Sequence, residues 1–95
     1  MNGSDVYVLV DLAKQKLDIT WSDKETDESI EEIVLNAIPI MKHKLGCSDI
    51  DFAAPGLDRH LFLEYVKYSW NDYAHVFDEE NRKDIIQARA LHGNY

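Results

Sequence analysis

Proline and glycine, which most often interrupt regular structure, are scarce in this chain: its 95 residues include two prolines and four glycines. A fold made only of strands needs frequent turns, and turns use these residue types heavily. Between the few interruptions, apolar side chains recur every three or four residues, which is the period of an α-helix. The sequence therefore predicts an all-α protein. At this length residues 1–95 are expected to form a single domain.

Two helices are expected in the N-terminal half. The first covers about residues 6–18, with Asp5 as its N-cap. The second starts after Thr26, a good N-cap residue, and ends at about Leu45, where Gly46 suits the left-handed position after a helix. Pro39 lies inside this second helix and predicts a kink there, because proline cannot donate the backbone hydrogen bond.

Two more helices are expected in the C-terminal half. A third helix, capped by Asp58, runs to about Phe77, and a weaker fourth covers about 80–91. The expected architecture is a small helical bundle of about four helices, with two long central helices and shorter terminal ones. The segment 82–95 is expected to be loosely ordered until it docks on a partner, because its apolar stripe is weak and its end is polar.

The third segment holds six of the ten aromatic residues and predicts most of the core. Tyr68 and Trp70 are left equally open to core and interface roles, because Tyr and Trp are frequent in both. The other expected core residues are apolar side chains at helical spacing: Leu12, Ile33, Ala37, Leu61, Phe62, Tyr65, Val66, Tyr73 and Phe77.

Eighteen acidic and ten basic residues give the chain a net charge of −8. Such a surface repels nucleic-acid phosphates and anionic membranes, so neither is an expected partner. The apolar run 6–10 ends at Asp11, has no basic residues before it and is too short for a signal peptide or a membrane span. The single cysteine cannot form an internal disulfide. A cytosolic start is expected.

Neither a metal site nor an active site is predicted. Zinc sites use three or four ligands in short paired spacings, whereas the histidines here are far apart and only His43 and Cys47 lie close in sequence. Cys47 lacks a helix N-terminal setting that would activate a thiol. The acidic run 23–32 is typical of a solvated face. We therefore expect no enzyme, no catalytic residue and no cofactor.

One set of apolar and polar positions recurs along the chain in a recognisable order: Leu9, Val10, Asp11, Leu12, Lys14, Leu17, Asp18, Ile19, Asp27, Ile30, Ile33, Ala37, Ile40, Leu45, Gly46, Leu63, Tyr65, Val66, Tyr68, Asn71, Phe77, Asn81 and Ile85. This order of parts resembles the small head–tail connector (adaptor) proteins of tailed bacteriophages and prophages. The resemblance covers about residues 6–88 and depends on spacing and apolar type, with no catalytic signature. Pro39 departs from that pattern and bears on the tilt of its helix.

The resemblance implies a structural virion protein. Such adaptors form a ring beneath the portal protein, extend the DNA channel and receive the next connector, stopper or tail component. The expected partners are therefore the portal protein, the next connector or tail component, and other copies of the chain, with DNA only as passing cargo and no membrane. The expected location is the head–tail junction of the virion, after assembly in the host cytoplasm.

A closed ring needs contacts between two different faces of the same subunit. We expect an acidic face to meet a basic or aromatic one, and the free protein to be largely monomeric because like-charged subunits repel one another. Two alternatives stay open: a small acidic helical interaction or regulatory module and, less favoured, an inhibitor that mimics DNA. The candidate interface residues are Asp23, Glu25, Glu28, Glu32, Arg59, Lys67, Tyr68, Trp70, Arg82 and Arg89.

Overall fold

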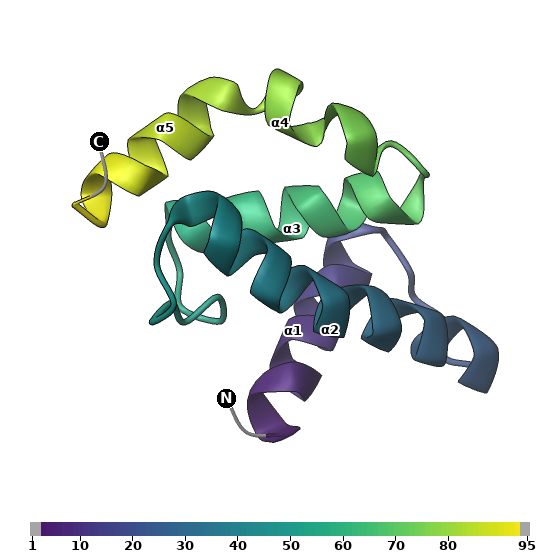
Figure 1. Cartoon of the computed structure of the whole chain (residues 1–95). Helices are drawn as coiled ribbons and strands as arrows, with labels where there is room; N and C mark the ends of the chain where they lie inside the picture. The colour runs from purple at the N-terminus through teal and green to yellow at the C-terminus, as the bar shows by residue number, and fades with distance from the viewer. Residues whose placement is uncertain (1–2, 94–95) are drawn as a thin grey trace.

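A computed structural model describes residues 3–93, and this part of the chain is all-helical, without strands (Figure 1). This confirms the predicted all-α class, but the predicted number of four helices is wrong. The structure has five α-helices and one short 3₁₀ helix: α1 (Gly3–Lys16), α2 (Lys24–Leu45), α3 (Leu57–Trp70), η1 (Ala74–Val76), α4 (Phe77–Glu80) and α5 (Arg82–Leu91).

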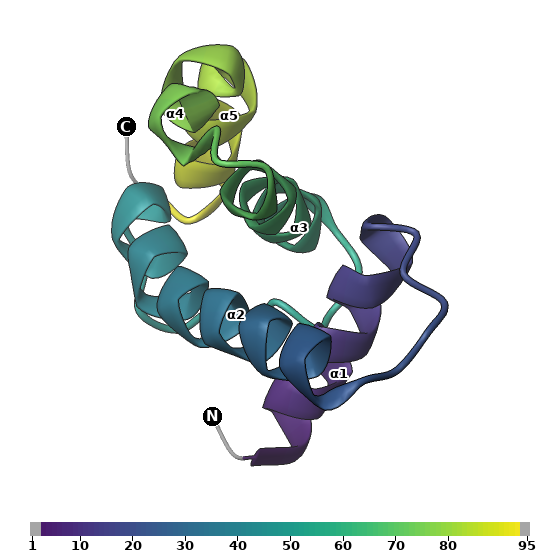
Figure 2. The same ribbon diagram turned by 90° about the vertical axis from the view of Figure 1, so that its right-hand side faces the viewer.

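The helices form two parts that share α3 as their common neighbour. The first three helices, with the loop 46–56, make up what we call the three-helix unit. Residues 74–93 form an arm, made of η1, α4 and α5, that lies along α3 on the side away from α1 (Figure 2). Within this arrangement α2 contacts α1, α3 and α5. The molecule is a flattened body of 42 × 28 × 18 Å.

The core lies mainly inside the three-helix unit. The loop 46–56 inserts Ile50 and Phe52 into this core. Phe52 stacks on Phe62 with ring centroids 4.7 Å apart, which closes the loop onto α3. The buried apolar residues are Leu9, Ala13, Ile19, Ile30, Val34, Ala37, Met41, Leu45, Ile50, Phe52, Leu61, Phe62, Val66, Phe77 and Ala88.

Helices α1, α2 and α3 end in the same way, with one residue in the left-handed conformation. That residue is Asp18 (φ 58°), Gly46 (φ 67°) or Asp72 (φ 62°). The amide of the following residue then donates to a carbonyl five residues back: Ile19 to Lys14 (2.9 Å), Cys47 to Lys42 (3.1 Å) and Tyr73 to Tyr68 (2.7 Å). This pair of features is the Schellman turn that terminates many helices. The predicted end of the second helix at Leu45 and Gly46 is confirmed.

The Asp72 turn corrects the prediction of a single helix as far as Phe77. The left-handed conformation of Asp72 ends α3 at Trp70, and the chain reverses into η1 and the arm. Asp tolerates this conformation because its short polar side chain can bond locally. As a result Tyr73, which we expected in the core, is 59% exposed, whereas Phe77 is fully buried as expected.

The other expected core positions divide into fully and partly buried ones. Ala37, Leu61, Phe62 and Val66 are fully buried, which confirms the prediction. The remaining three lie half-buried at the margin of the core, where they pack against it: Leu12, Ile33 and Tyr65.

The starts of three helices also differ from the predictions. Asp23, and not Thr26, caps α2. Gly56 takes the N-cap position of α3 at φ 147°, a backbone conformation that glycine adopts most easily, so Asp58 lies in the first turn and is not the cap. The first helix begins at Gly3 and therefore includes Asp5, whose side chain lies outside the described ones. Helix α2 continues unbroken through Pro39.

The arm is attached to the three-helix unit by two buried side chains and a set of polar contacts. Phe77 and Ala88 are its fully buried residues. The ring of Phe77 meets Tyr65 and Tyr68 edge-on, with centroids 5.1 and 5.5 Å away. The polar contacts are Lys44 to Asp78 (2.7 Å), Tyr68 to Glu80 (3.0 Å), Arg89 to the Lys44 carbonyl (2.8 Å) and His92 to Asp58 (2.8 Å).

Candidate interaction surfaces

The outward side of α2 changes character along its length. Its buried residues recur every three or four positions and face the core, which leaves the opposite side of the helix to solvent. The N-terminal half of that side carries exposed carboxylates, and the next turns carry exposed apolar groups. We call this surface the α2 face, formed by Glu25, Glu28, Glu32, Leu35, Asn36, Pro39 and Ile40.

Helix α5 has an outward side of the complementary kind. Ala88 faces the core, whereas the exposed residues of the helix begin with two cations and continue with large apolar side chains. Ile86 is 58% exposed and Leu91 is 72% exposed, so both apolar side chains are largely open to solvent. We call this surface the α5 face, formed by Arg82, Lys83, Ile86, Gln87, Ala90 and Leu91.

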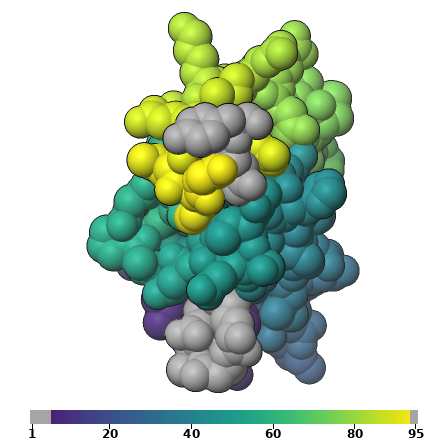
Figure 3. Space-filling model, turned by 60° about the vertical axis from the view of Figure 1, so that its left-hand side comes forward, coloured from purple at the N-terminus to yellow at the C-terminus, as the bar shows by residue number. Residues whose placement is uncertain are grey.

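The two faces belong to helices on different sides of the molecule. In the view along α3, the arm lies above α3 and α2 lies below it (Figure 2). The end-on surface view shows the loop after α2 filling the middle, with the last residues of α5 above it and α2 along one edge (Figure 3). One copy therefore presents two unlike faces. Along the chain, the α2 face changes from acidic to apolar and the α5 face changes from basic to apolar.

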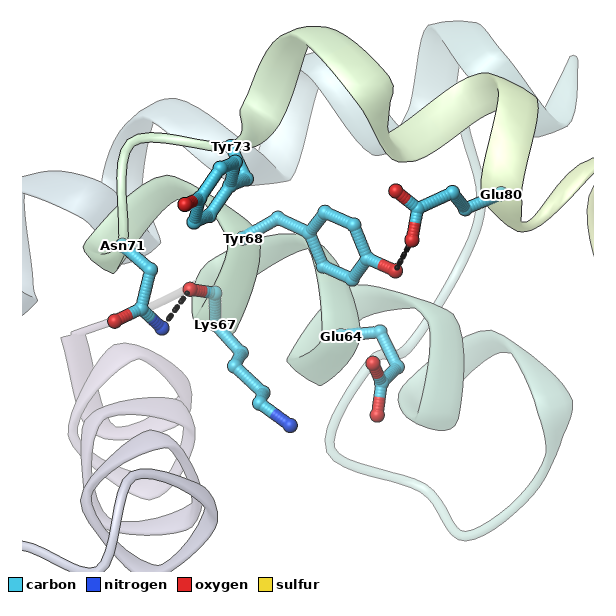
Figure 4. A pocket seen from close by; sticks show the side chains of 6 residues that line it. All are labelled: Glu64, Lys67, Tyr68, Asn71, Tyr73 and Glu80. Atoms are coloured by element: carbon cyan, nitrogen blue, oxygen red, sulfur yellow. Dashed lines mark hydrogen bonds between the residues drawn. The ribbon is translucent and has the colours of Figure 1, made fainter.

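A hollow of about 450 Å³ lies between α3 and the start of the arm (Figure 4). Tyr68 donates its hydroxyl to Glu80 across this hollow, and that hydrogen bond raises the pKa of Tyr68. Burial disfavours the charged form of Glu64, yet the hydrogen bond and charge of Lys16, 2.6 Å away, lower its pKa overall. Both carboxylates of the hollow are thus engaged within the chain: Glu64 pairs with α1, and Glu80 joins the arm to α3 through Tyr68.

A second hollow separates the end of α2 from the arm. Its rim combines the cations of α2 and α5 with the acids of α4, and the ion pair between Lys44 and Asp78 spans it. Ile86 of the α5 face lies at its edge. The apolar part of the α5 face therefore continues into a groove of mixed charge.

The predicted acidic residues fall into two groups. Asp23 is occupied at the start of α2: the amide and the hydroxyl of Thr26 donate to its two oxygens at 2.9 Å each, and these bonds lower the pKa of Asp23. Glu25, Glu28 and Glu32 lie together on the α2 face, as their spacing of three and four residues requires.

The predicted basic and aromatic residues do not gather on one surface. Arg59 lies near the start of α3 and donates to the Ala53 carbonyl at 3.4 Å, while Trp70 ends the same helix and is 37% exposed. Tyr68 packs edge-on against Phe77 beneath the arm.

Of the remaining three predicted residues, Arg82 and Arg89 line the hollow between the end of α2 and the arm, and Lys67 lines the hollow beside Tyr68. Arg89 donates to the Lys44 carbonyl and so holds the arm. Lys67 is exposed on α3, and Arg82 is exposed at the start of α5.

Sequence reasoning missed several exposed apolar residues. Trp21 is 54% exposed in the link between α1 and α2, and Leu35 is 48% exposed on the α2 face. Ile86 and Leu91 on α5 are further members of this group. A tryptophan in an otherwise polar link was a usable signal for Trp21. The other three looked like ordinary members of apolar stripes until the helices were placed.

No three His, Cys, Asp or Glu side chains among the described residues lie close enough together to hold a metal ion. His43 is exposed and Cys47 is half-buried on the far side of the Gly46 turn. Within the described range, no helix is both long and apolar enough to cross a bilayer. Comparison of the chain with models of known protein families, with curated proteins and with solved structures found no match.

Proposed function

We propose that the chain is a structural adaptor of the head–tail connector in a tailed bacteriophage or prophage. In this role it assembles as a ring beneath the portal protein, extends the DNA channel and receives the next connector, stopper or tail component. The chain contributes surfaces for assembly and carries out no reaction. The resemblance of residues 6–88 to such adaptors is the starting point of the proposal.

The observation that supports it best is the pair of unlike faces on one small subunit. Exposed apolar side chains bordered by polar residues mark surfaces that bind other proteins. A ring requires each subunit to present one face to the neighbour before it and a different face to the neighbour after it. The α2 face and the α5 face differ in charge, share an apolar portion and belong to helices on different sides of α3.

Net charge supports the same role. With −8 per subunit, a ring lining a DNA channel repels the phosphate backbone and lets the duplex pass without binding it. The same charge opposes closure of a ring from free subunits at low salt. A portal that holds neighbouring subunits side by side raises their effective concentration and overcomes this repulsion.

The direct test is the molar mass of the protein by light scattering, alone and mixed with the portal protein of the same phage or prophage, at low and at moderate salt. We expect a monomer in the absence of the portal and a complex with many copies of the chain per portal ring in its presence. A portal that binds no subunit under either condition contradicts the proposal. The chain would then be a general helical interaction module.

A further inference from the structure

We infer that the α5 face of one copy docks in parallel on the α2 face of the next copy, with Lys83 opposite Glu32. This inference names the surface through which the proposed ring closes, and in that sense it rests on the proposed function. The partner it commits to is a second copy of the same chain, on the grounds of complementary charge and of matching residue order on the two helices.

The match in residue order is the first argument. On α2 the charged Glu32 is followed by Leu35 after three residues and by Ile40 after eight. On α5 the oppositely charged Lys83 is followed by Ile86 after three residues and by Leu91 after eight. All six side chains are exposed. Two parallel helices aligned at Glu32 and Lys83 therefore place opposite charges beside each other and apolar turns beside apolar turns.

The angular positions agree as well. Successive residues of a helix turn by about 100°. Relative to Glu32, Leu35 lies about 60° to one side and Ile40 about 80° to the other, and Ile86 and Leu91 have the same relation to Lys83. When two parallel helices face each other, the left flank of one helix lies beside the right flank of the other. Leu35 then shares one edge of the contact with Leu91 of the next copy, while Ile40 shares the other edge with Ile86 of that copy.

The centre of the contact is chemically compatible. Asn36 lies between the flanks of the α2 face, and Gln87 occupies the same position on the α5 face, four residues after the charged one. Two side-chain amides can donate to and accept from each other. Three residues further on, Pro39 meets the small side chain of Ala90, which permits a close approach of the helices. No position along the aligned stretch places like charges opposite each other.

The expected contact is small. Helix α5 has ten residues and is about 15 Å long, so the aligned stretch covers only about three helical turns. Contacts of this size belong to the weak end of protein interfaces. The contact is therefore expected to form at high concentration or when a template holds the subunits, which fits a subunit that is monomeric when free.

The test uses the full chain in a Cys47→Ser background, so that every thiol is introduced by design. One chain carries Asn36→Cys and a second, with a different tag, carries Gln87→Cys; the two are mixed at millimolar concentration and oxidised. We expect a disulfide between the unlike chains in several-fold excess over disulfides between like chains. Equal yields of like and unlike dimers, or no disulfide at all, would overturn the inference.

Charge exchange tests the parallel orientation. Glu32→Lys alone and Lys83→Glu alone each place like charges at every contact, so both should reduce the yield of the 36–87 disulfide. The double variant, carrying both changes in every chain, restores opposite charges and should restore the yield. Asp11→Lys is the matched control for Glu32→Lys, since it makes the same change of charge at an exposed position of α1. If the double variant stays as weak as the single ones, Glu32 and Lys83 do not face each other and the inference is wrong.

The outcome can be separated from that of the portal experiment. Cross-linking uses the chain alone and does not depend on any portal. If the 36–87 disulfide fails to form while the portal still recruits many subunits, the inferred surface is wrong and the adaptor role stands. If the disulfide forms while the portal binds nothing, the surface is right and the adaptor role is wrong.

Discussion

The three-helix unit and the arm are held in place by different kinds of contact. The three-helix unit is built around a continuous set of fully buried aliphatic and aromatic side chains, including the stacked pair Phe52 and Phe62. The arm buries only Phe77 and Ala88 completely and packs the partly buried Ile85 against the core, and its other attachments are hydrogen bonds and ion pairs. Apolar burial dominates stability, whereas exposed ion pairs contribute little.

This difference implies that the two parts have different local stabilities. Segments with few buried apolar contacts open at a lower free energy than the core does. The arm is therefore expected to detach while the three-helix unit stays folded. Because α5 carries one of the two proposed docking faces, an arm that adjusts its position would help neighbouring subunits fit around a ring.

The largest effect is expected from truncating the core of the three-helix unit. Phe62→Ala removes a fully buried ring and its stacking on Phe52, which should lower the free energy of unfolding by about 3–5 kcal/mol. Chemical denaturation followed by circular dichroism measures the loss. Tyr73→Ala is the control: because Tyr73 is exposed, it should change stability by about 0.5 kcal/mol or less. Similar losses for the two variants would contradict the proposed division between core and surface.

A smaller effect is expected at the root of the arm. Phe77→Ala removes the edge-on contacts with Tyr65 and Tyr68 and should cost about 1–3 kcal/mol, because the loss cannot exceed what holds the arm in place. Amide exchange should accelerate in residues 74–93 and hardly at all in α1. A uniform acceleration throughout the chain would mean that the arm and the three-helix unit unfold as one.

Next in size is the charged hydrogen bond between the arm and the end of α2. Arg89→Ala removes the donor to the Lys44 carbonyl and should cost about 1–2 kcal/mol, in the range for hydrogen bonds to a charged group. The same cation is favourable at the negative end of the α2 dipole. Arg89→Lys should recover part of the loss in denaturation experiments. Full stability in Arg89→Ala would show that this contact does not hold the arm.

The smallest expected effect is on stability at acidic pH, and it arises within the three-helix unit. Hydrogen bonds from Lys14 (2.7 Å) and Ser22 (2.8 Å) hold the pKa of Asp27 below its ordinary value of 3.8. A lowered pKa stabilises the fold at pH values above 3.8, and this contribution disappears as the pH falls through the lower value of the folded state. Lys14→Met should therefore flatten the loss of stability measured by denaturation between about pH 5 and pH 2. An unchanged pH profile would contradict the assignment.

The sequence was sufficient for the helical class because apolar periodicity and the shortage of turn residues are local signals. The end of α2 was also predicted from the sequence, because Gly46 favours the left-handed conformation that follows a helix. The same turn at Asp18 and Asp72 was missed, because an aspartate indicates the left-handed conformation far less clearly than a glycine does, and only the closed hydrogen bonds reveal its role. That omission alone produced the error in the length of α3 and the wrong burial of Tyr73.

The candidate surfaces could be predicted only in part. The acidic positions Glu25, Glu28 and Glu32 share a face by helical spacing, which sequence alone fixes. Whether Arg59 and Arg89 are available to a partner depends on backbone carbonyls brought close by folding, which no local pattern encodes. Leu35, Ile86 and Leu91 likewise became surface candidates only once the directions of the buried sides of α2 and α5 were known.

The prediction that residues 82–95 are loosely ordered until docking concerns the same arm. The structure shows α5 as a formed helix attached through Ala88, Arg89 and His92, and residues 94 and 95 lie outside the described ones. A formed helix in one arrangement is compatible with frequent detachment. The prediction is therefore a statement about the free energy of opening, which amide exchange measures directly.

Native-state hydrogen exchange of the free, wild-type protein tests the division into three-helix unit and arm most directly. The amides of α5 (Arg82–Leu91) should exchange through an opening that costs less free energy and depends less on denaturant than the opening of α2 and α3, because a detaching arm exposes little surface. Amides of α5 that are as well protected as those of α3, with the same dependence on denaturant, would show a single cooperative unit and contradict the account.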